Sequence, residues 1–126
     1  MNESSTPSPG NTGAQAEEQA KGFLEAQGLQ LTERNYRCHQ GELDLIMQDG
    51  ETVVFVEVRY RKNAAFGGPA ASITPAKQRR IIIAANHYLQ SRQDKRTPAC
   101  RFDVLAITGK DPQNISWIKD AFQSDF

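Results

Sequence analysis

The sequence of 126 residues has few of the features that mark membrane, secreted or disulfide-stabilised proteins. Its two cysteines, Cys38 and Cys100, form no C-x-x-C motif and cannot build a disulfide framework. No hydrophobic run approaches the roughly 18 residues of a transmembrane helix. Segment 1–12 consists mainly of Ser, Thr, Pro, Asn and Gly and has no apolar stretch like that of a secretory signal. We therefore expect a cytoplasmic protein that has no membrane partner.

A net charge is also lacking, since 15 basic residues balance 15 acidic ones. A neutral total normally argues against a nucleic-acid partner. The charges are unevenly distributed, however. Residues 1–58 carry three basic and ten acidic residues (net −7), residues 59–101 carry ten and one (net +9), and residues 102–126 carry two and four (net −2). Such polarisation along the chain favours an anionic partner.

The length suits one domain, which we place at 13–126 after a flexible tail at 1–12. Apolar residues at helical spacing predict a helix that begins at Gly13 and is ended by Gly28. Thr74 and Pro75 are typical of a helix start, and this second helix is expected to run to about residue 90.

Runs of β-forming residues lie between and after these helices. The Asp-Gly dipeptide at 49–50 separates two of them and is a strong hairpin signal. The last run is ambiguous between a strand and a short helix. The order α-β-β-β-α-β predicts an α/β fold in which a mixed sheet is flanked by helices. The expected strands are 29–38, 42–48, 52–61, 100–108 and, with the ambiguity stated, 115–122.

Acidic residues fall at alternate positions on both strands of the hairpin. Glu42 and Asp44 lie two residues apart and share one face of their strand. If residues 49–50 form a two-residue loop, Glu42 is opposite Glu57 and Asp44 is opposite Phe55. The three carboxylates then converge on one face, where like charges destabilise the hairpin unless something neutralises them.

A hard divalent cation, Mg²⁺ or Mn²⁺, is the natural neutralising agent for carboxylate oxygens. The alternative is that Glu57 lies at a solvated strand end and pairs with Arg37, Arg59 or Arg61. Its place inside the apolar run 53–58 disfavours this alternative, because a charge buried there is costly unless it is paired or bound to a metal.

At these residues the chain resembles the PD-(D/E)xK nuclease superfamily, which has a restriction-endonuclease-like fold. Glu42-Leu43-Asp44 and Glu57-Val58-Arg59 look like its D-(x)n-E-x-K signature. More closely, the chain resembles the small bacterial YraN-like family, which is similar to archaeal Holliday-junction resolvases. The resemblance covers about residues 13–108. It also rests on Gly13-x-x-x-Glu17, Arg34-Asn35-Tyr36, Gly41 to Ile46, Val54 to Arg59, Lys77 to Arg80 and Arg101 to Val104.

The resemblance implies a divalent-metal-dependent endonuclease that hydrolyses structured or branched DNA. The resolvases act as dimers, so the resemblance also points to a homodimer. The implied metal ligands are Glu17, Asp44 and Glu57, and the implied catalytic residues are Asp44, Glu57 and Arg59. Arg59 departs from the family pattern, which has Lys there. A guanidinium cannot act as a base, although it can hold a phosphate and stabilise developing charge.

Two assignments remain open among the acidic residues. Glu18 competes with Glu17 as the carboxylate on the first helix, and both can instead be ordinary solvent-facing charges. Glu42 is either a group that supports the metal ligands or a residue that only takes part in strand pairing.

Basic residues surround the second helix start and the end of the preceding strand. They would form a basic rim beside the acidic site and hold phosphates. The alternative is an ordinary solvated face, although cations at a helix N-terminus oppose the helix dipole. The loop at 66–68 is either a flap or a connector. The candidate nucleic-acid-binding residues are Arg59, Arg61, Lys62, Lys77, Gln78, Arg79 and Arg80.

A nuclease is the leading interpretation. The second is a non-catalytic nucleic-acid-binding module that retains the nuclease fold, and the third is an adaptor that binds a protein partner.

Overall fold

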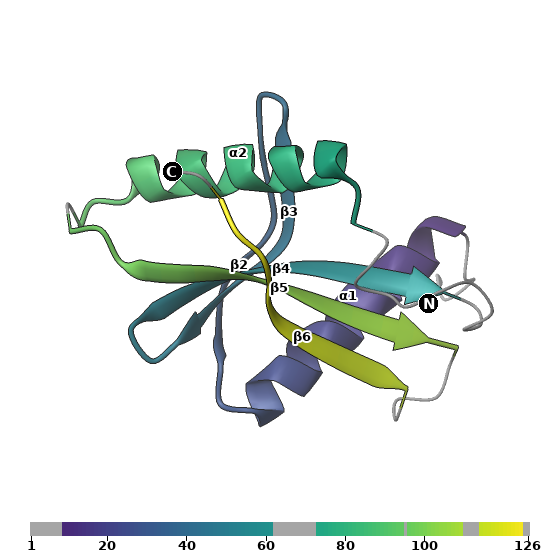
Figure 1. Ribbon diagram of the computed structural model, residues 1–126. Helices are drawn as coiled ribbons and strands as arrows, with labels where there is room; N and C mark the ends of the chain where they lie inside the picture. The colour runs from purple at the N-terminus through teal and green to yellow at the C-terminus, as the bar shows by residue number, and fades with distance from the viewer. Residues whose placement is uncertain (1–8, 62–72, 95, 110–113, 125–126) are drawn as a thin grey trace, which may run out of the picture.

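The computed structural model describes residues 9–61, 73–94, 96–109 and 114–124 (Figure 1). Within them it has two helices and five strands, in the order α-β-β-β-α-β-β. The predicted α/β class is confirmed. The elements are α1 (Pro9–Ala26), β2 (Gln30–Cys38), β3 (Gly41–Asp49), β4 (Thr52–Arg61), α2 (Pro75–Ser91), β5 (Ala99–Thr108) and β6 (Ile115–Phe122).

The helices begin and end at capping signals. Gly28 has φ 100° and follows α1, where the N–H groups of Gly28 and Leu29 donate to the carbonyls of Glu25 and Leu24 in a Schellman arrangement. Thr74 caps α2, because its hydroxyl accepts from Lys77 N at 3.1 Å. Our start for the first helix was wrong: α1 begins at Pro9, so residues 9–12 belong to the helix and not to a tail. Proline is favoured in a first helical turn, where its missing N–H costs nothing.

The strands form one sheet in the order β2-β3-β4-β5-β6, and the ambiguous segment 115–122 is its last strand. Only β4 and β5 are parallel among these neighbours, and α2 connects them. Figure 1 shows α1 on one face of the sheet and α2 on the other. Neither helix is long and apolar enough to cross a membrane, within the part of the chain described.

The hairpin register differs from our expectation by two residues. Asp49 is not in the loop but pairs with Thr52, so the loop is Gly50-Glu51. Asp49 extends the strand because its carboxylate binds Arg101 of β5 at 3.1 Å. A shift of two keeps the paired side chains on their expected faces. It does separate Glu42 from Glu57, because the β3–β4 pairing ends at Leu45 and Val56, before it reaches Glu42.

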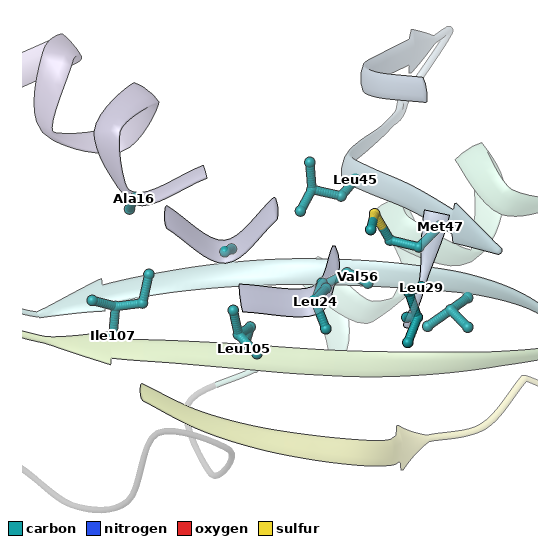
Figure 2. Packing of buried hydrophobic residues seen from close by; sticks show 10 residues of the cluster. Ala16, Leu24, Leu29, Leu45, Met47, Val56, Leu105 and Ile107 are labelled. Carbon is teal, nitrogen blue, oxygen red and sulfur yellow. The ribbon is translucent and has the colours of Figure 1, made fainter. Parts of the chain in front are cut away.

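Two apolar clusters hold the layers together, one on each face of the sheet. Figure 2 shows the first, in which α1 covers β3, β4 and β5; it consists of Ala16, Ala20, Leu24, Leu29, Leu45, Met47, Val54, Val56, Leu105 and Ile107. The second lies under α2 and contains Ile81, Ala84 and Ala85 of that helix. Tyr88 and Leu89, one turn further along α2, are only partly buried.

The start of β3 lies against α2. An ideal Cβ at Gly41 would be only 2.7 Å from Ala84 N and 3.0 Å from Arg80 O. Only glycine permits so close an approach of two backbones. This contact positions the first two turns of α2 beside Glu42, the next residue of β3.

Candidate active site

Asp44 lies where β3 separates from β4. Hydrogen-bonded pairing between these strands ends at Leu45 and Val56. Asp44 is the residue just before Leu45 in β3, and its carboxylate accepts a hydrogen bond from Val58 N at 2.8 Å. The side chain thus satisfies a backbone donor that has lost its strand partner. Asp44 is thereby fixed beside Glu57.

Glu57 is the buried acid of the site, with only 4% of its surface exposed. Burial and then the negative charge of Asp44 raise its pKa to about 8, although Lys77 pulls the pKa down. The Lys77 Nζ atom lies 3.5 Å from Glu57 Oε2, whereas Glu57 Oε1 is buried with no hydrogen-bond partner among the described residues. The Glu57 carboxyl therefore keeps its proton to a higher pH than an exposed glutamate does.

The first helix presents two neighbouring acids that behave differently. Glu17 is half-buried, and its pKa is raised by burial and then by the charge of Asp44. Glu18 is exposed and pairs with Arg34 at 3.2 Å and Lys21 at 3.5 Å, which lower its pKa. Of the two, Glu17 is thus the one whose pKa is raised by the charge of the Asp44 carboxylate.

Glu42 binds cations of α2. It forms a salt bridge with Arg80 and lies 3.8 Å from Lys77 Nζ. Lys77 therefore lies between Glu42 and Glu57. The convergence of Glu42 with the other two acids is not seen, because the register places Glu42 nearer to the helix.

An open groove of 510 Å³ joins the buried acid to basic side chains. Acidic, basic and hydroxyl groups from the end of β4 and the start of α2 share its walls. Its lining residues are Glu57, Val58, Arg59, Tyr60, Thr74, Ala76, Lys77 and Arg80.

The remaining candidate residues lie near this groove or outside the residues that the structure describes. Arg79 is exposed on α2. Gln78 donates its amide to Ile73 O at 3.1 Å, so this donor serves the chain itself. Arg61 is half-buried at the end of β4. Lys62 and the loop at 66–68 lie outside the described residues.

The carboxylates are the residues that could hold a cation. No three His, Cys, Asp or Glu side chains within the described ranges lie together as a ready metal cluster. Asp44 and Glu57 are nevertheless adjacent hard-oxygen donors, and Glu57 Oε1 is a buried acceptor that lacks a donor. This donor set fits Mg²⁺ or Mn²⁺. Glu17, which interacts with Asp44 electrostatically, is the nearest third candidate that the pKa shifts identify.

Sequence reasoning missed two contributors to the site. Asn35 is hydrogen-bonded to Glu17 and has φ 53°, a left-handed conformation that asparagine tolerates better than most residues. Thr74 lines the groove in addition to capping α2. The available signal for Asn35 was an asparagine inside a strand pattern. No local sequence feature indicated that Thr74 lines the groove.

The comparisons with known proteins identify a family without an assigned activity. A "UPF0102 protein" from Nitrosomonas eutropha is 59% identical over 112 residues, which are 89% of this chain and 93% of that one. Another, from Nitrosococcus oceani, is 54% identical over 112 residues, 88% of this chain and 90% of the relative. The model of the uncharacterised protein family UPF0102 matches residues 16–107. The chain belongs to UPF0102, the YraN-like family that the sequence resembled.

Proposed function

We propose that the groove is the active site of a divalent-metal-dependent endonuclease that acts on structured or branched DNA. One observation carries the proposal: a buried glutamate, Glu57, lies against Asp44 and opens onto a groove lined by Arg59, Lys77 and Arg80. A buried acid beside a second acid, with one carboxyl oxygen that has no hydrogen-bond partner among the described residues, is costly for a folded chain. Its persistence is explained when the two together bind a cation.

Asp44 and Glu57 would hold the cation, with Glu17 of α1 as a third ligand. When bound there, Mg²⁺ or Mn²⁺ supplies Lewis acidity that polarises a phosphate oxygen and lowers the pKa of water. The raised pKa of Glu57 means that its carboxyl must release a proton before it can act as a ligand. Activity therefore depends on the ionisation of Glu57.

The basic residues would bind and orient the phosphate. Arg59 and Glu57 lie two apart on β4 and line the same groove, so the guanidinium can hold a scissile phosphate beside the acids. It stays charged and stabilises the charge that develops in the transition state. Lys77 Nζ lies 3.5 Å from Glu57 Oε2 and would be a second donor to phosphate.

The substrate class follows from the charge of the rim and from the superfamily resemblance. Arg79 is exposed on α2, and Arg80 lines the groove, where it pairs with Glu42. Contacts from such basic side chains bind nucleic-acid backbones without reading sequence. The preference for branched DNA is carried by the resemblance to the resolvases.

The test is cleavage of a four-way DNA junction, a duplex and a single strand in the presence of Mg²⁺ or Mn²⁺. We expect cuts that need the metal and are lost in Asp44→Asn and Glu57→Gln. Glu18→Gln is the matched control, because Glu18 is the neighbouring acid whose side chain pairs with Arg34 and Lys21. Purified protein that cleaves no DNA form with either metal would refute the proposal.

One observation favours a second function, a nucleic-acid-binding module without catalysis. A side-chain cation, Lys77 Nζ, already lies 3.8 Å from Glu42 and 3.5 Å from Glu57. In that case DNA binding survives Glu57→Gln and weakens in the double variant Arg79→Gln/Arg80→Gln. Calorimetry with Mn²⁺ separates the two functions, since only the nuclease requires a cation site that depends on Glu57.

A further inference from the structure

A second and larger pocket, of 810 Å³, lies at the other end of α2. Its walls come from the C-terminal part of α2, the start of β5 and the end of β6. Lys77 and Arg92 mark the two ends of the helix and are about 22 Å apart along its axis, at about 1.5 Å per residue. We call it the arginine pocket, after Arg92, Arg96 and Arg101 in its lining. None of the residues that line the groove at Glu57 lines it.

Two of these arginines have unused hydrogen-bond donors. The Nη1 group of Arg92 and the Nη2 group of Arg101 are buried and have no acceptor among the described residues. Arg101 already binds Asp49 and Asp103 through its other nitrogens. A buried guanidinium N–H without an acceptor is costly, and ligands commonly supply what the protein does not. The pocket thus has two guanidinium N–H groups without an acceptor, one on Arg92 and one on Arg101, although the charge of Arg101 is already paired with Asp49 and Asp103.

The acidic residues of the pocket do not supply that acceptor. Asp94 is bound to Arg96, both through the backbone N–H and through the guanidinium. The Oδ2 atom of Asp120 accepts from Gln123. Arg92 has no ion-pair partner within the described ranges. A ligand group that carries negative charge therefore matches the open donors.

The pocket also has an aromatic wall. Phe55, Phe102 and Phe122 form a stack in which successive ring centroids are 5.4 and 5.0 Å apart, with interplanar angles of 30° and 20°. Phe55 and Phe102 are buried, whereas Phe122 is only partly buried, and both Phe102 and Phe122 line the pocket. A planar ring in the pocket can continue this stack.

We propose that the arginine pocket binds a 5′-nucleotide, with the phosphate on Arg92 and Arg101 and the base stacked on Phe122. An anionic group and a planar ring on one small molecule satisfy both features of the pocket, and its volume lies in the range of small-molecule sites. Amide and hydroxyl groups that line the pocket, on Gln90 and Thr97, are available to the base and sugar. The nucleotide can be free or can be the 5′-phosphorylated end of a strand. The proposal stands apart from the nuclease function, because the two sets of residues do not overlap.

Calorimetric titration of the full chain with AMP and GMP tests the proposal. We expect binding that weakens roughly tenfold or more in Arg92→Gln, the factor that a charge-assisted hydrogen bond contributes. Phe122→Leu should weaken binding about fivefold through loss of stacking. Arg34→Gln, an exposed arginine of β2 that does not line the pocket, is the control and should bind like the wild type.

Two further probes separate the parts of the ligand. Inorganic phosphate and unphosphorylated adenosine should each bind at least about tenfold more weakly than AMP, because each lacks one of the two contacts.

The single tryptophan, Trp117, donates a hydrogen bond to Asp103, and Asp103 binds Arg101 of the pocket. The fluorescence of Trp117 should therefore change on AMP addition. A 5′-phosphorylated trinucleotide that competes with AMP identifies a strand end as the source, and one that does not compete identifies the free nucleotide.

Three results would overturn the proposal. The first is no heat and no fluorescence change with millimolar AMP or GMP. The second is binding that both Arg92→Gln and Phe122→Leu leave unchanged. The third is inorganic phosphate binding as tightly as AMP, since the base would then contribute nothing.

Discussion

The Val58 amide donates a hydrogen bond to Asp44 Oδ2 at 2.8 Å, at the point where β3 and β4 stop pairing. Asp44 therefore has a structural role and a candidate catalytic one. Asp44→Asn keeps an oxygen that can accept from Val58, whereas Asp44→Ala leaves the amide unpaired. In urea unfolding at pH 6 we expect Ala to lower the unfolding free energy by about 1–3 kcal/mol and Asn to lower it less.

The two variants separate folding from chemistry. If Asp44 is also a ligand, both lose metal-dependent cleavage although Asn remains stable. An Asn variant that retains full cleavage would remove Asp44 from the catalytic site.

The pKa of Glu57 predicts how stability depends on pH. The folded-state pKa of about 8 lies above the ordinary glutamate value of 4.5, so between these pH values the unfolded chain loses the proton and the folded chain keeps it. Stability should fall as pH rises through this window, by at most about 1.4 kcal/mol per pH unit, and level off above pH 8. Glu57→Gln should lack this fall in denaturation curves measured from pH 5 to 9.

Divalent cations provide the complementary measurement. At pH 8, Mn²⁺ should raise the Tm of the wild type by binding the ionised acid in the folded state, and it should not raise that of Glu57→Gln. Identical pH profiles for the two proteins would show that Glu57 has an ordinary pKa.

Gly41 and Gly22 make a matched pair with opposite expectations. A Cβ at Gly41 would lie 2.7 Å from the backbone nitrogen of Ala84, so Gly41→Ala must push α2 away from β3 and should cost about 1–3 kcal/mol. Nothing lies within 4 Å of a Cβ at Gly22 in α1, where alanine is the better helix former. Gly22→Ala should raise stability by about 0.5–1 kcal/mol. Chemical denaturation of both variants checks the pair.

Asp103 is the buried acid that ties β6 to the sheet. It is completely buried and accepts from Arg101 Nε, Trp117 Nε1 and Asp120 N at 2.9–3.0 Å. Asp103→Asn removes the charge that Arg101 is paired with and should cost about 3 kcal/mol or more. The blue shift of Trp117 emission on folding and the Tm both report the loss.

Asp94→Asn is the surface control for Asp103. Asp94 pairs with Arg96 at an exposed site, and such pairs contribute little to stability. The Tm of Asp94→Asn should therefore equal that of the wild type. Equal effects of the two substitutions would contradict a special role for Asp103.

The sequence predicted the elements whose signals are local. The bounds 52–61 of β4, the cap at Thr74 and the stop at Gly28 follow from residue types within a few positions. The hairpin register was missed because Arg101, 52 residues away, draws Asp49 into the strand. The strand β6 was ambiguous for the same reason, since its anchor is Asp103 of β5.

The candidate site was predictable in part. Period-two spacing predicted that Asp44 and Glu57 lie close together, and their side chains do interact. The alternation itself is not kept, because Leu43 and Leu45 on either side of Asp44 pack in different clusters. The sequence did not decide between Glu17 and Glu18 as the third acid, because these neighbours differ only in which side of α1 they occupy. Their separation depends on Arg34 and Lys21, which attract Glu18 away from Asp44.

Arg59 decides what kind of catalysis the groove can perform. A guanidinium that acts by binding phosphate can be replaced by an ammonium with the same charge, whereas a neutral amide removes the charge. We expect Arg59→Lys to keep the cleavage rate within about tenfold and Arg59→Gln to reduce it by about 10²–10³-fold. Single-turnover cleavage at saturating Mg²⁺ measures both. A large gain in rate in Arg59→Lys, with a new pH-dependent limb, would instead indicate that the site works best with a lysine base and that the native arginine restrains it.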